Sequence, residues 1–248
     1  MRRFIIEQTE ADLTSHSGLA LVGMAISRYT ELVASVTRAV PLRHGIAHAD
    51  VLKSYLGLFC IGKSDFEAVA NVREDEFFSE ALGIGAVPLP ETLRQRLDER
   101  AEAFLPEVSE AAIGFLDNVQ APCSAVRTGH VPLDADVTPL DNSQTKKEGV
   151  SRTYKGYDGY APIAAYLGQE GWCLGFELRH GKQHCQNGTP AFLEAVLERA
   201  RRLTEQPILL RLDGGNDAIE NIEVVLSHNE QDTARAPVDF LIKWNPRK

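Results

Sequence analysis

The sequence has no excess of positive charge. Its 26 lysine and arginine residues are outnumbered by 35 aspartate and glutamate residues, for a formal net charge of −9 at pH 7. Proteins that hold nucleic acid mainly through bulk electrostatics carry a basic footprint, so this class of binding is excluded for the chain as a whole. Any binding of DNA needs a local basic face, or metal ions between acidic groups and phosphate.

Cysteine and long apolar runs are also scarce. The four cysteines are widely scattered and form no CxxC pair, which indicates reduced structural thiols in a cytosolic protein. The N-terminal stretch MRRFIIEQTEADLTSHSG has an apolar run of only three residues, too short for a signal peptide. No apolar stretch reaches the roughly 18 residues that span a membrane. We therefore expect a cytoplasmic protein with no membrane association.

Residues 1–125 are expected to form a helical region. Apolar residues recur at helical spacing over residues 18–40, 50–60 and 64–72, and Asp50 is a candidate helix cap. Two prolines then break the chain, and the stretch ETLRQRLDERAEAFL predicts a further helix. A helix, a turn containing glycine and a helix rich in arginine and glutamine form the outline of a helix-turn-helix.

The second helix of this outline carries the residues that we expect to face a DNA duplex: Arg94, Gln95 and Arg96. The alternative is an ordinary solvated helix face, and composition does not decide between the two. A linker is predicted near residues 120–129, and it leads into a second region, residues 126–248.

The second region predicts a mixed α/β sheet. Alternating or apolar runs predict five strands, at residues 131–138, 159–168, 172–179, 207–213 and 238–244. The polar segment 141–158 is expected to be a loop or hairpin tip. Helices are predicted from Thr189, with Thr189 as the cap and Pro190 at the first helical position, and over residues 216–228. Three strands followed by helix, strand, helix and strand is the order of a ribonuclease-H-like core.

Three aspartates lie at strand positions where a metal site can form. Asp134 and Asp136 are two residues apart in the first strand and share one face, and Asp213 ends the fourth strand. The first and fourth strands are neighbours in a ribonuclease-H-like sheet, so Asp136 and Asp213 are expected to meet. Two such carboxylates repel each other unless a cation lies between them, and magnesium suits ligands that are all oxygen.

The glycines after Asp213 admit two interpretations. Gly214 and Gly215 keep bulk away from Asp213, which allows a backbone phosphate to approach the carboxylate. The alternative is a plain strand-ending turn, because aspartate and glycine are common in turns. Composition and periodicity leave this choice open.

Longer stretches of sequence resemble a known family. The block VPLDADVTPLDNSQTKKEGVSRTYKGYDGYAPIAAYLGQEG, with ILLRLDGGNDAIENI and VDFLIKWNPRK further on, closely resembles the DDE-type transposases of bacterial insertion sequences. The likeness extends over nearly the whole chain, and it implies an N-terminal DNA-binding region followed by a ribonuclease-H-like catalytic domain.

The resemblance assigns roles to the aspartates. The first catalytic acid of the family, in a D-x-T setting, maps best to Asp136 with Thr138 two residues on, and Asp134 is the runner-up. The second catalytic acid maps to Asp213. The third is a glutamate on a helix downstream of the fifth strand, for which the sequence has no match, since Glu220 and Glu223 precede that strand. We therefore expect an incomplete catalytic domain, the N-terminal portion of a longer transposase.

A basic cluster lies in the polar segment after the first strand. Its members, interleaved with three tyrosines, are Lys146, Lys147, Arg152 and Lys155. They form the best local basic patch for holding phosphate beside the acids, although a solvated loop has the same composition. The spacing of His180, His184 and Cys185 resembles part of a zinc site, but no further ligands follow at finger-like spacing.

The resemblance implies DNA transposition by phosphodiester cleavage and strand transfer, with Mg²⁺ or Mn²⁺ as cofactor. The expected partners are DNA, as terminal repeats and target, and the pattern leaves room for a homo-oligomer. Because the third acid is missing, a catalytically inactive DNA-binding remnant is the first alternative. A metal-dependent nuclease that does not transpose is the second.

Overall fold

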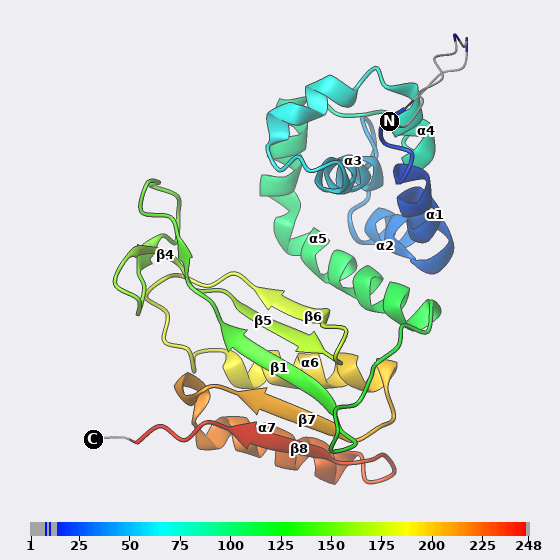
Figure 1. The fold of residues 1–248 in the computed structure, drawn as a ribbon. Coiled ribbons are helices and arrows are strands. Elements are labelled where there is room, and N and C mark those ends of the chain that lie inside the picture. Colours follow the sequence, from blue (N-terminus) through cyan, green and yellow to red (C-terminus); the bar gives the residue numbers. More distant parts are fainter. Residues whose placement is uncertain (1–7, 9, 11–13, 247–248) are drawn as a thin grey trace, which may run out of the picture. The chain divides into compact units, whose positions relative to one another are not determined.

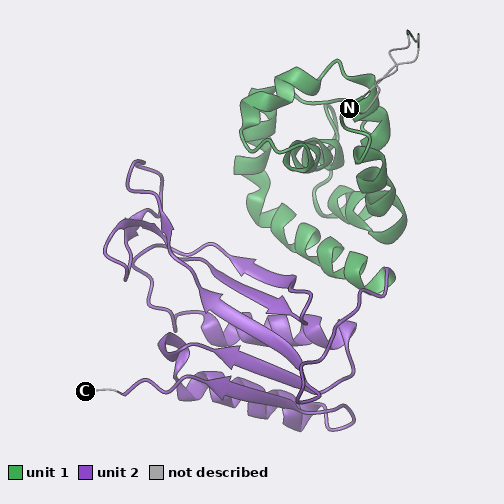
Figure 2. Ribbon diagram, viewed as in Figure 1, with its two compact units in different colours: residues 1–118 green, residues 119–248 purple. Residues whose placement is uncertain are grey.

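The computed structural model describes residues 8, 10 and 14–246. The chain forms two compact units, residues 1–118 and residues 119–248 (Figure 2). The predicted boundary, after residue 125, lies further along because the segment that follows residue 118 binds to the second unit. Trp172 Nε1 donates to the carbonyl oxygen of Pro122 at 2.8 Å, and Gln169 Nε2 donates to that of Ala125 at 2.7 Å.

The first unit is helical, as expected. Its elements are α1 (Leu19–Tyr29), α2 (Leu32–Ala39), α3 (His48–Cys60), the 3₁₀ helix η1 (Phe66–Val72), α4 (Glu76–Leu82) and α5 (Pro90–Asn118). Leu58, Phe78 and Leu93 are fully buried in its core. α1 and α4 pack closely at Gly23, where a Cβ atom would lie 1.7 Å from the carbonyl oxygen of Ala81.

The stretch 18–40, where apolar residues recur at helical spacing, forms two helices. The chain turns by 65° between α1 and α2, and Thr30 takes an extended backbone conformation with φ −136° and ψ 157°. The hydroxyl of Thr30 donates to the carbonyl oxygen of Ile26 at 2.7 Å and accepts from the backbone N–H of Leu32 at 3.3 Å. One side chain thus ends the first helix and begins the second, an arrangement that apolar periodicity does not reveal.

Asp50 does not cap α3. The helix begins at His48, after Ala47, and Asp50 lies in its first turn. The Asp50 carboxylate accepts hydrogen bonds from the backbone N–H groups of Gly85, at 3.0 Å, and Ala86, at 3.3 Å, and it pairs with Lys53 at 3.2 Å. It therefore holds the turn between α4 and α5, the turn of the expected helix-turn-helix.

The second unit is built on a five-stranded sheet (Figure 1). Its strands are β1 (Val131–Val137), β5 (Ile163–Leu167), β6 (Trp172–Glu177), β7 (Ile208–Leu212) and β8 (Val238–Ile242), in the order β6-β5-β1-β7-β8. β1 pairs antiparallel with β5 and parallel with β7. This is the strand order of a ribonuclease-H-like sheet, so the predicted α/β fold class is confirmed.

Both helices of this unit, α6 (Thr189–Leu203) and α7 (Ile219–Gln231), cover the same face of the sheet (Figure 1). Alternate strand residues such as Leu133 and Leu210 point to that face and are fully buried with Leu193 and Leu197 of α6. Burying a leucine completely contributes about 1.5–3 kcal/mol. On the other face, Phe176 remains 61% exposed.

The polar segment 141–158, expected to be a loop or hairpin tip, contains a short antiparallel pairing of β3 (Ser151–Arg152) with β4 (Asp158–Tyr160). It belongs to a second sheet of three short strands, β2 (Leu140–Asp141), β4 (Asp158–Tyr160) and β3 (Ser151–Arg152), in the order β2-β4-β3. The strand predicted over residues 159–168 is accordingly divided between β4 and β5. The small sheet follows directly on β1 and lies beyond the end of that strand.

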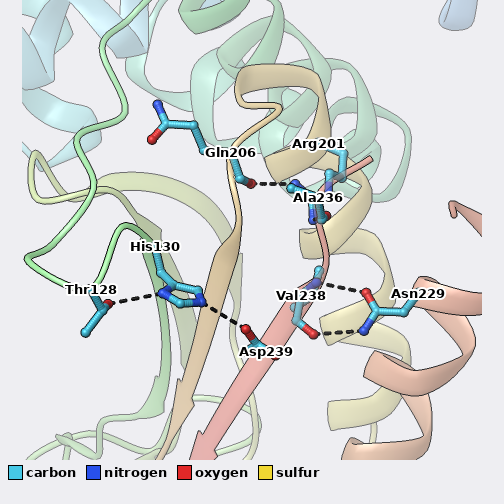
Figure 3. Close-up of polar contacts among 8 residues, drawn as sticks. All are labelled: Thr128, His130, Arg201, Gln206, Asn229, Ala236, Val238 and Asp239. Carbon is cyan, nitrogen blue, oxygen red and sulfur yellow. Dashed lines mark hydrogen bonds and ion pairs between the residues drawn. The ribbon is translucent and has the colours of Figure 1, made fainter. Parts of the chain in front are cut away.

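Polar contacts tie the edge strand β8 to the rest of the sheet (Figure 3). The side chain of Asn229 both donates to and accepts from the backbone of Val238, at 2.8 Å each. Arg201 binds the carbonyl oxygen of Ala236 at 2.5 Å, and His130 reaches from the start of β1 to Asp239 at 2.9 Å. Because the last contact crosses over β7, it fixes β8 relative to β1.

Candidate active site

Asp136 and Asp213 occupy equivalent places on two neighbouring strands. β1 and β7 run parallel, and the last residues paired in their register are Ala135 and Leu212. Each aspartate is the next residue along its own strand, so both lie at the same edge of the sheet. The fold thus brings together the two acids that the sequence singled out, while their catalytic role stays a prediction.

The pKa of Asp136 is raised, first by burial and also by the negative charge of Asp213. Burial raises the pKa of Asp136, the backbone N–H of Val137 opposes this through a hydrogen bond of 2.8 Å, and the charge of Asp213 raises the pKa again. A shared cation would relieve both the repulsion and the loss of hydration. Two neighbouring carboxylates suit a divalent ion that completes its shell with water or phosphate oxygens.

Asp134, the runner-up for the first acid, is already paired. Arg211 donates from Nε and Nη2 to the two carboxylate oxygens of Asp134, at 2.5 Å each. The two residues face each other directly in the β1–β7 register. Such a bidentate pair holds both oxygens, which favours Asp136 over Asp134 as the metal ligand.

The turn after β7 holds Asp213 in place. Asp213 Oδ1 accepts from the backbone N–H of Gly215 at 3.1 Å and from Asn216 Nδ2 at 2.9 Å. A Cβ atom on Gly215 would lie 3.2 Å from Oδ1 and 3.4 Å from Cys185 Sγ. Glycine at this position therefore keeps the carboxylate accessible, in agreement with the interpretation that a phosphate can approach it.

A loop between β6 and α6 clamps this turn. Cys185 Sγ and Gln186 Nε2 both donate to the carbonyl oxygen of Gly215, at 2.7 and 2.8 Å. Gln186 also accepts from Asn221 Nδ2 of α7 at 3.0 Å. The loop thus links the Asp213 turn to two helices, and His184 and Cys185 border the site through this turn.

Arg179 anchors the loop from inside, a role that the sequence analysis missed. Its side chain is only 2% exposed, and it donates to Glu177 Oε1 at 2.8 Å, to Thr189 Oγ1 at 2.9 Å and to the carbonyl oxygen of Cys185 at 3.2 Å. Thr189 is consequently not the cap of α6, because its hydroxyl serves this network and Gly188 precedes the helix at φ 79°. An arginine close after an apolar strand is the signal that could have pointed to this anchor.

The basic cluster lies on the small sheet. Lys146 and Lys147 are exposed, and the ammonium group of Lys155 lies 5.3 Å from the centre of the Tyr154 ring. The guanidinium of Arg152 is exposed and reaches Asp158 at only 3.8 Å. These groups are free to meet phosphate, and their role in DNA binding stays a prediction.

The three polar residues of the expected recognition helix point in different directions. Arg94 pairs with Glu67 and lies over the ring of Phe66, 5.6 Å from its centre. Gln95 is exposed and donates to Glu99 at 2.8 Å. Arg96 is half-buried, with Nη1 3.5 Å from Nε2 of His48. Consecutive residues of a helix are about 100° apart, so the three do not share one surface, and their contact with DNA stays a prediction.

Comparison with known proteins decides the family. The sequence profile described as Transposase DDE domain group 1 matches residues 2–233. The chain belongs to the DDE transposases. The predicted resemblance is thereby confirmed for nearly the whole sequence.

One solved structure also aligns with most of the chain. The solved structure is that of a piggyBac transposase synaptic complex with hairpin DNA. The alignment covers 92% of this chain and 51% of the piggyBac chain, at 11% sequence identity and a TM-score of 0.39. The chain thus spans about half the length of that transposase. No curated protein matches the chain.

DDE transposases generally use divalent metal ions, and the residues of this family member fit one such ion. Asp136 and Asp213 line a hollow of about 500 Å³ on the open face of the sheet, together with the paired Asp134 and Arg211 and with Leu241 and Lys243. Within residues 8, 10 and 14–246, no three side chains of His, Cys, Asp or Glu gather at metal-binding distance. The site therefore offers two carboxylates and open space for oxygen ligands from water or substrate.

No single helix in the described part of this DDE-family chain is long and apolar enough to cross a membrane. The bent pair of α1 and α2 passes the same test of length and composition when the two helices are taken together. Leu19, Ile26, Leu32 and Val36 of this pair are buried in the first unit.

Proposed function

We propose that this chain acts on DNA in transposition, by metal-dependent phosphodiester hydrolysis at element ends followed by strand transfer. The observation that carries the proposal is the pair of Asp136 and Asp213 at adjacent ends of β1 and β7, with Asp134 withdrawn into its pair with Arg211. Terminal repeats and target DNA are the proposed partners, and a homo-oligomer is the proposed assembly.

Asp136 and Asp213 would hold Mg²⁺ or Mn²⁺ between them. Such an ion activates a water molecule and stabilises the developing charge on a phosphodiester. The turn from Asp213 to Asn216 keeps one carboxylate oriented, and Gly215 leaves room for the phosphate. Lys146, Lys147, Arg152 and Lys155 would hold the neighbouring phosphates from the small sheet.

No group of three or more His, Cys, Asp or Glu side chains that could hold a metal ion lies among the described residues, and this supports a second candidate function. Fewer carboxylates mean weaker metal binding and leave the place of a second ion unspecified. We therefore propose that cleavage by this chain alone is absent or very weak. In that case the chain would act as a DNA-binding protein that occupies element ends.

Metal titration and nicking together test the proposal. Mn²⁺ binding to the full chain, followed by electron paramagnetic resonance, is expected to weaken by roughly tenfold or more, about 1.4 kcal/mol, in Asp213→Asn. The fold should remain, because asparagine keeps an oxygen that can accept from Gly215. Asp239→Asn, a carboxylate at the other end of the same sheet, is the matched control and should bind Mn²⁺ as the wild type does.

The two candidate functions differ in nicking of element-end DNA with Mg²⁺. Cleavage that requires Asp136 and Asp213 and depends on the end sequence supports the transposase. Binding of the ends without cleavage supports the DNA-binding function. Cleavage indifferent to sequence points to a nuclease that does not transpose, and unchanged Mn²⁺ affinity in Asp213→Asn contradicts the metal site itself.

A further inference from the structure

A second hollow adjoins the acid pair on the side of the small sheet. Its volume is about 480 Å³. It is lined by the end of β1, by the small sheet, by the loop after β6 and by the Asp213 turn, through Val137, Thr153, Tyr154, Gln183, His184 and Asp213. Asp213 lines this hollow and also the one on the open sheet face. A group bound in the second hollow therefore lies next to whatever the carboxylates hold.

The hollow has an aromatic wall on a rigid support. Tyr154 is 69% exposed although it lines the hollow. The residue before it, Thr153, is buried and binds the carbonyl oxygen of Tyr157 through both its backbone N–H and its hydroxyl, at 2.8 Å each. A tight turn thus presents the Tyr154 ring to solvent, with the ammonium group of Lys155 5.3 Å from the ring centre. Such rings serve as stacking platforms for nucleobases, because every base has a π-face.

The rim of the hollow carries positive charge and hydrogen-bonding groups. Arg152 and Lys182 line it and are both exposed. The backbone N–H of Lys182 donates to Ser151 Oγ at 3.0 Å, so the loop after β6 is joined to the small sheet that carries Arg152. The amide of Gln183 and the ring of His184 also line the hollow and carry polar groups. This combination of cations, amide and aromatic ring matches a nucleotide.

The volume of the hollow is suited to a single nucleotide. Pockets of roughly 300–1,000 Å³ hold ligands of drug size, and one nucleotide belongs to that class. A base that is still paired stays stacked in its duplex and cannot enter.

We propose that this hollow binds one unpaired nucleotide of the DNA strand whose phosphate meets Asp136 and Asp213. The base stacks on Tyr154, and the adjoining phosphates contact Arg152 and Lys182. The inference rests on the proposed function and deepens it, since it names the substrate as DNA that is unpaired beside the reacting phosphate. Extrusion of a base from a duplex is unfavourable, and it is least so where the base is already single-stranded.

Binding of two DNA probes to the full chain tests the inference. One probe is a blunt duplex, and the other is the same duplex with a short single-stranded extension that carries 2-aminopurine. We expect the extended probe to bind roughly tenfold more tightly by fluorescence anisotropy, the effect of about one stacked base. We also expect the 2-aminopurine fluorescence to fall when the base stacks on the ring.

Three variants assign the effect to the ring of Tyr154. Tyr154→Ala is expected to abolish the preference for the extended probe and leave the affinity for the blunt probe unchanged. Tyr154→Phe keeps the ring and is expected to keep the preference. Tyr166→Ala, which removes another exposed tyrosine outside this hollow, is the matched control and should behave as the wild type.

The outcomes separate this inference from the function on which it rests. Equal binding of the two probes by the wild type overturns the nucleotide site and leaves the proposed function standing. Loss of the preference in Tyr154→Phe as well as in Tyr154→Ala overturns the stacking contact. Failure of the wild type to bind either probe contradicts the proposed function and the nucleotide site together.

Discussion

Asp134 and Arg211 face each other across the parallel pair β1 and β7 and are joined by two hydrogen bonds of 2.5 Å. Asp136 is two residues further along β1 on the same face, where it has Asp213 as its neighbour instead of an arginine. Two aspartates in one strand thus have opposite environments. One is paired with an arginine, and the other lies beside a second carboxylate.

This difference predicts opposite results for Asp136→Asn and Asp134→Asn. Asp136→Asn should abolish Mn²⁺ binding, whereas Asp134→Asn should leave the affinity within about twofold, because its carboxylate is occupied. The Asp134 and Arg211 side chains are 46% and 40% exposed, so loss of their pair should destabilise the chain by only about 1 kcal/mol or less. Metal titration and urea unfolding measure the two effects. Equal loss of Mn²⁺ affinity in both variants would contradict the assignment.

The raised pKa of Asp136 also predicts how metal and pH change stability. A carboxyl group with a higher pKa in the folded state than in the unfolded state destabilises the fold as the pH rises through that range. At pH 7 without metal, Asp136→Asn should therefore raise the melting temperature, by about 1–3 °C. Mg²⁺ should raise the melting temperature of the wild type only. Calorimetry with and without a chelator checks this, and an equal response of both proteins to Mg²⁺ would count against it.

Gly23→Ala is expected to disrupt the first unit. The added methyl group would lie 1.7 Å from the carbonyl oxygen of Ala81, so α1 and α4 must separate, at a cost of about 3 kcal/mol or more. Gly18→Ala is the matched control, since a Cβ atom at Gly18 meets nothing within 4 Å. Urea unfolding should show a large loss for the first variant and little change for the second. Similar stability of the two would refute the close packing at Gly23.

Arg179→Met is expected to loosen the loop that clamps the Asp213 turn. It leaves Glu177, Thr189 and the carbonyl group of Cys185 without their donor. Because Arg179 is buried but Glu177 is 45% exposed, the cost is about 1–3 kcal/mol. Mn²⁺ affinity should fall as well, because the turn loses its support through Cys185. Arg202→Met, at a charged position of α6 outside the loop, serves as the comparison. Unchanged metal affinity in a folded Arg179→Met protein would remove Arg179 from the site.

The environment of His48 predicts that the first unit loses stability in acid. Its ring is buried and packs edge-on against Phe104 with centroids 5.3 Å apart. Burial lowers the pKa of His48, and the charges of Arg96 and Arg100 lower it further. The unfolded chain therefore takes up this proton more readily, and stability is lost as the pH falls below the ordinary value of 6.5.

Urea unfolding at pH 7.5 and at pH 5.5 measures this linkage. His48→Gln should reduce the loss of stability at the lower pH, whereas the same substitution at the exposed His44 should not. The second unit has a histidine of the same kind, His228, whose pKa is lowered by burial and by the charge of Arg201. Hydrogen exchange measured only in the first unit separates the effect of His48 from that of His228. An identical pH profile for wild type and His48→Gln would exclude His48 as the source.

Much of the architecture follows from local patterns. Alternation and apolar runs predict the five strands and the two helices of the second unit, because burial of one face imposes a period on the sequence of each element. The order of these elements then leads to the strand order of the sheet. Asp136 and Asp213 could be expected to meet for the same reason, since each lies at the end of one of two neighbouring strands.

The sequence by itself determined the class of fold, the strand ends that carry the acids and, through its long motifs, the family. Tertiary structure alone decided that Arg211 neutralises Asp134, that Arg179 is buried against the loop that clamps the Asp213 turn, and that Thr30 divides one apolar stretch into two helices. The physical reason is the range of the interactions. Periodicity records which side of an element is buried. The partner of a charge is chosen by register, and here the two partners are 77 residues apart along the chain.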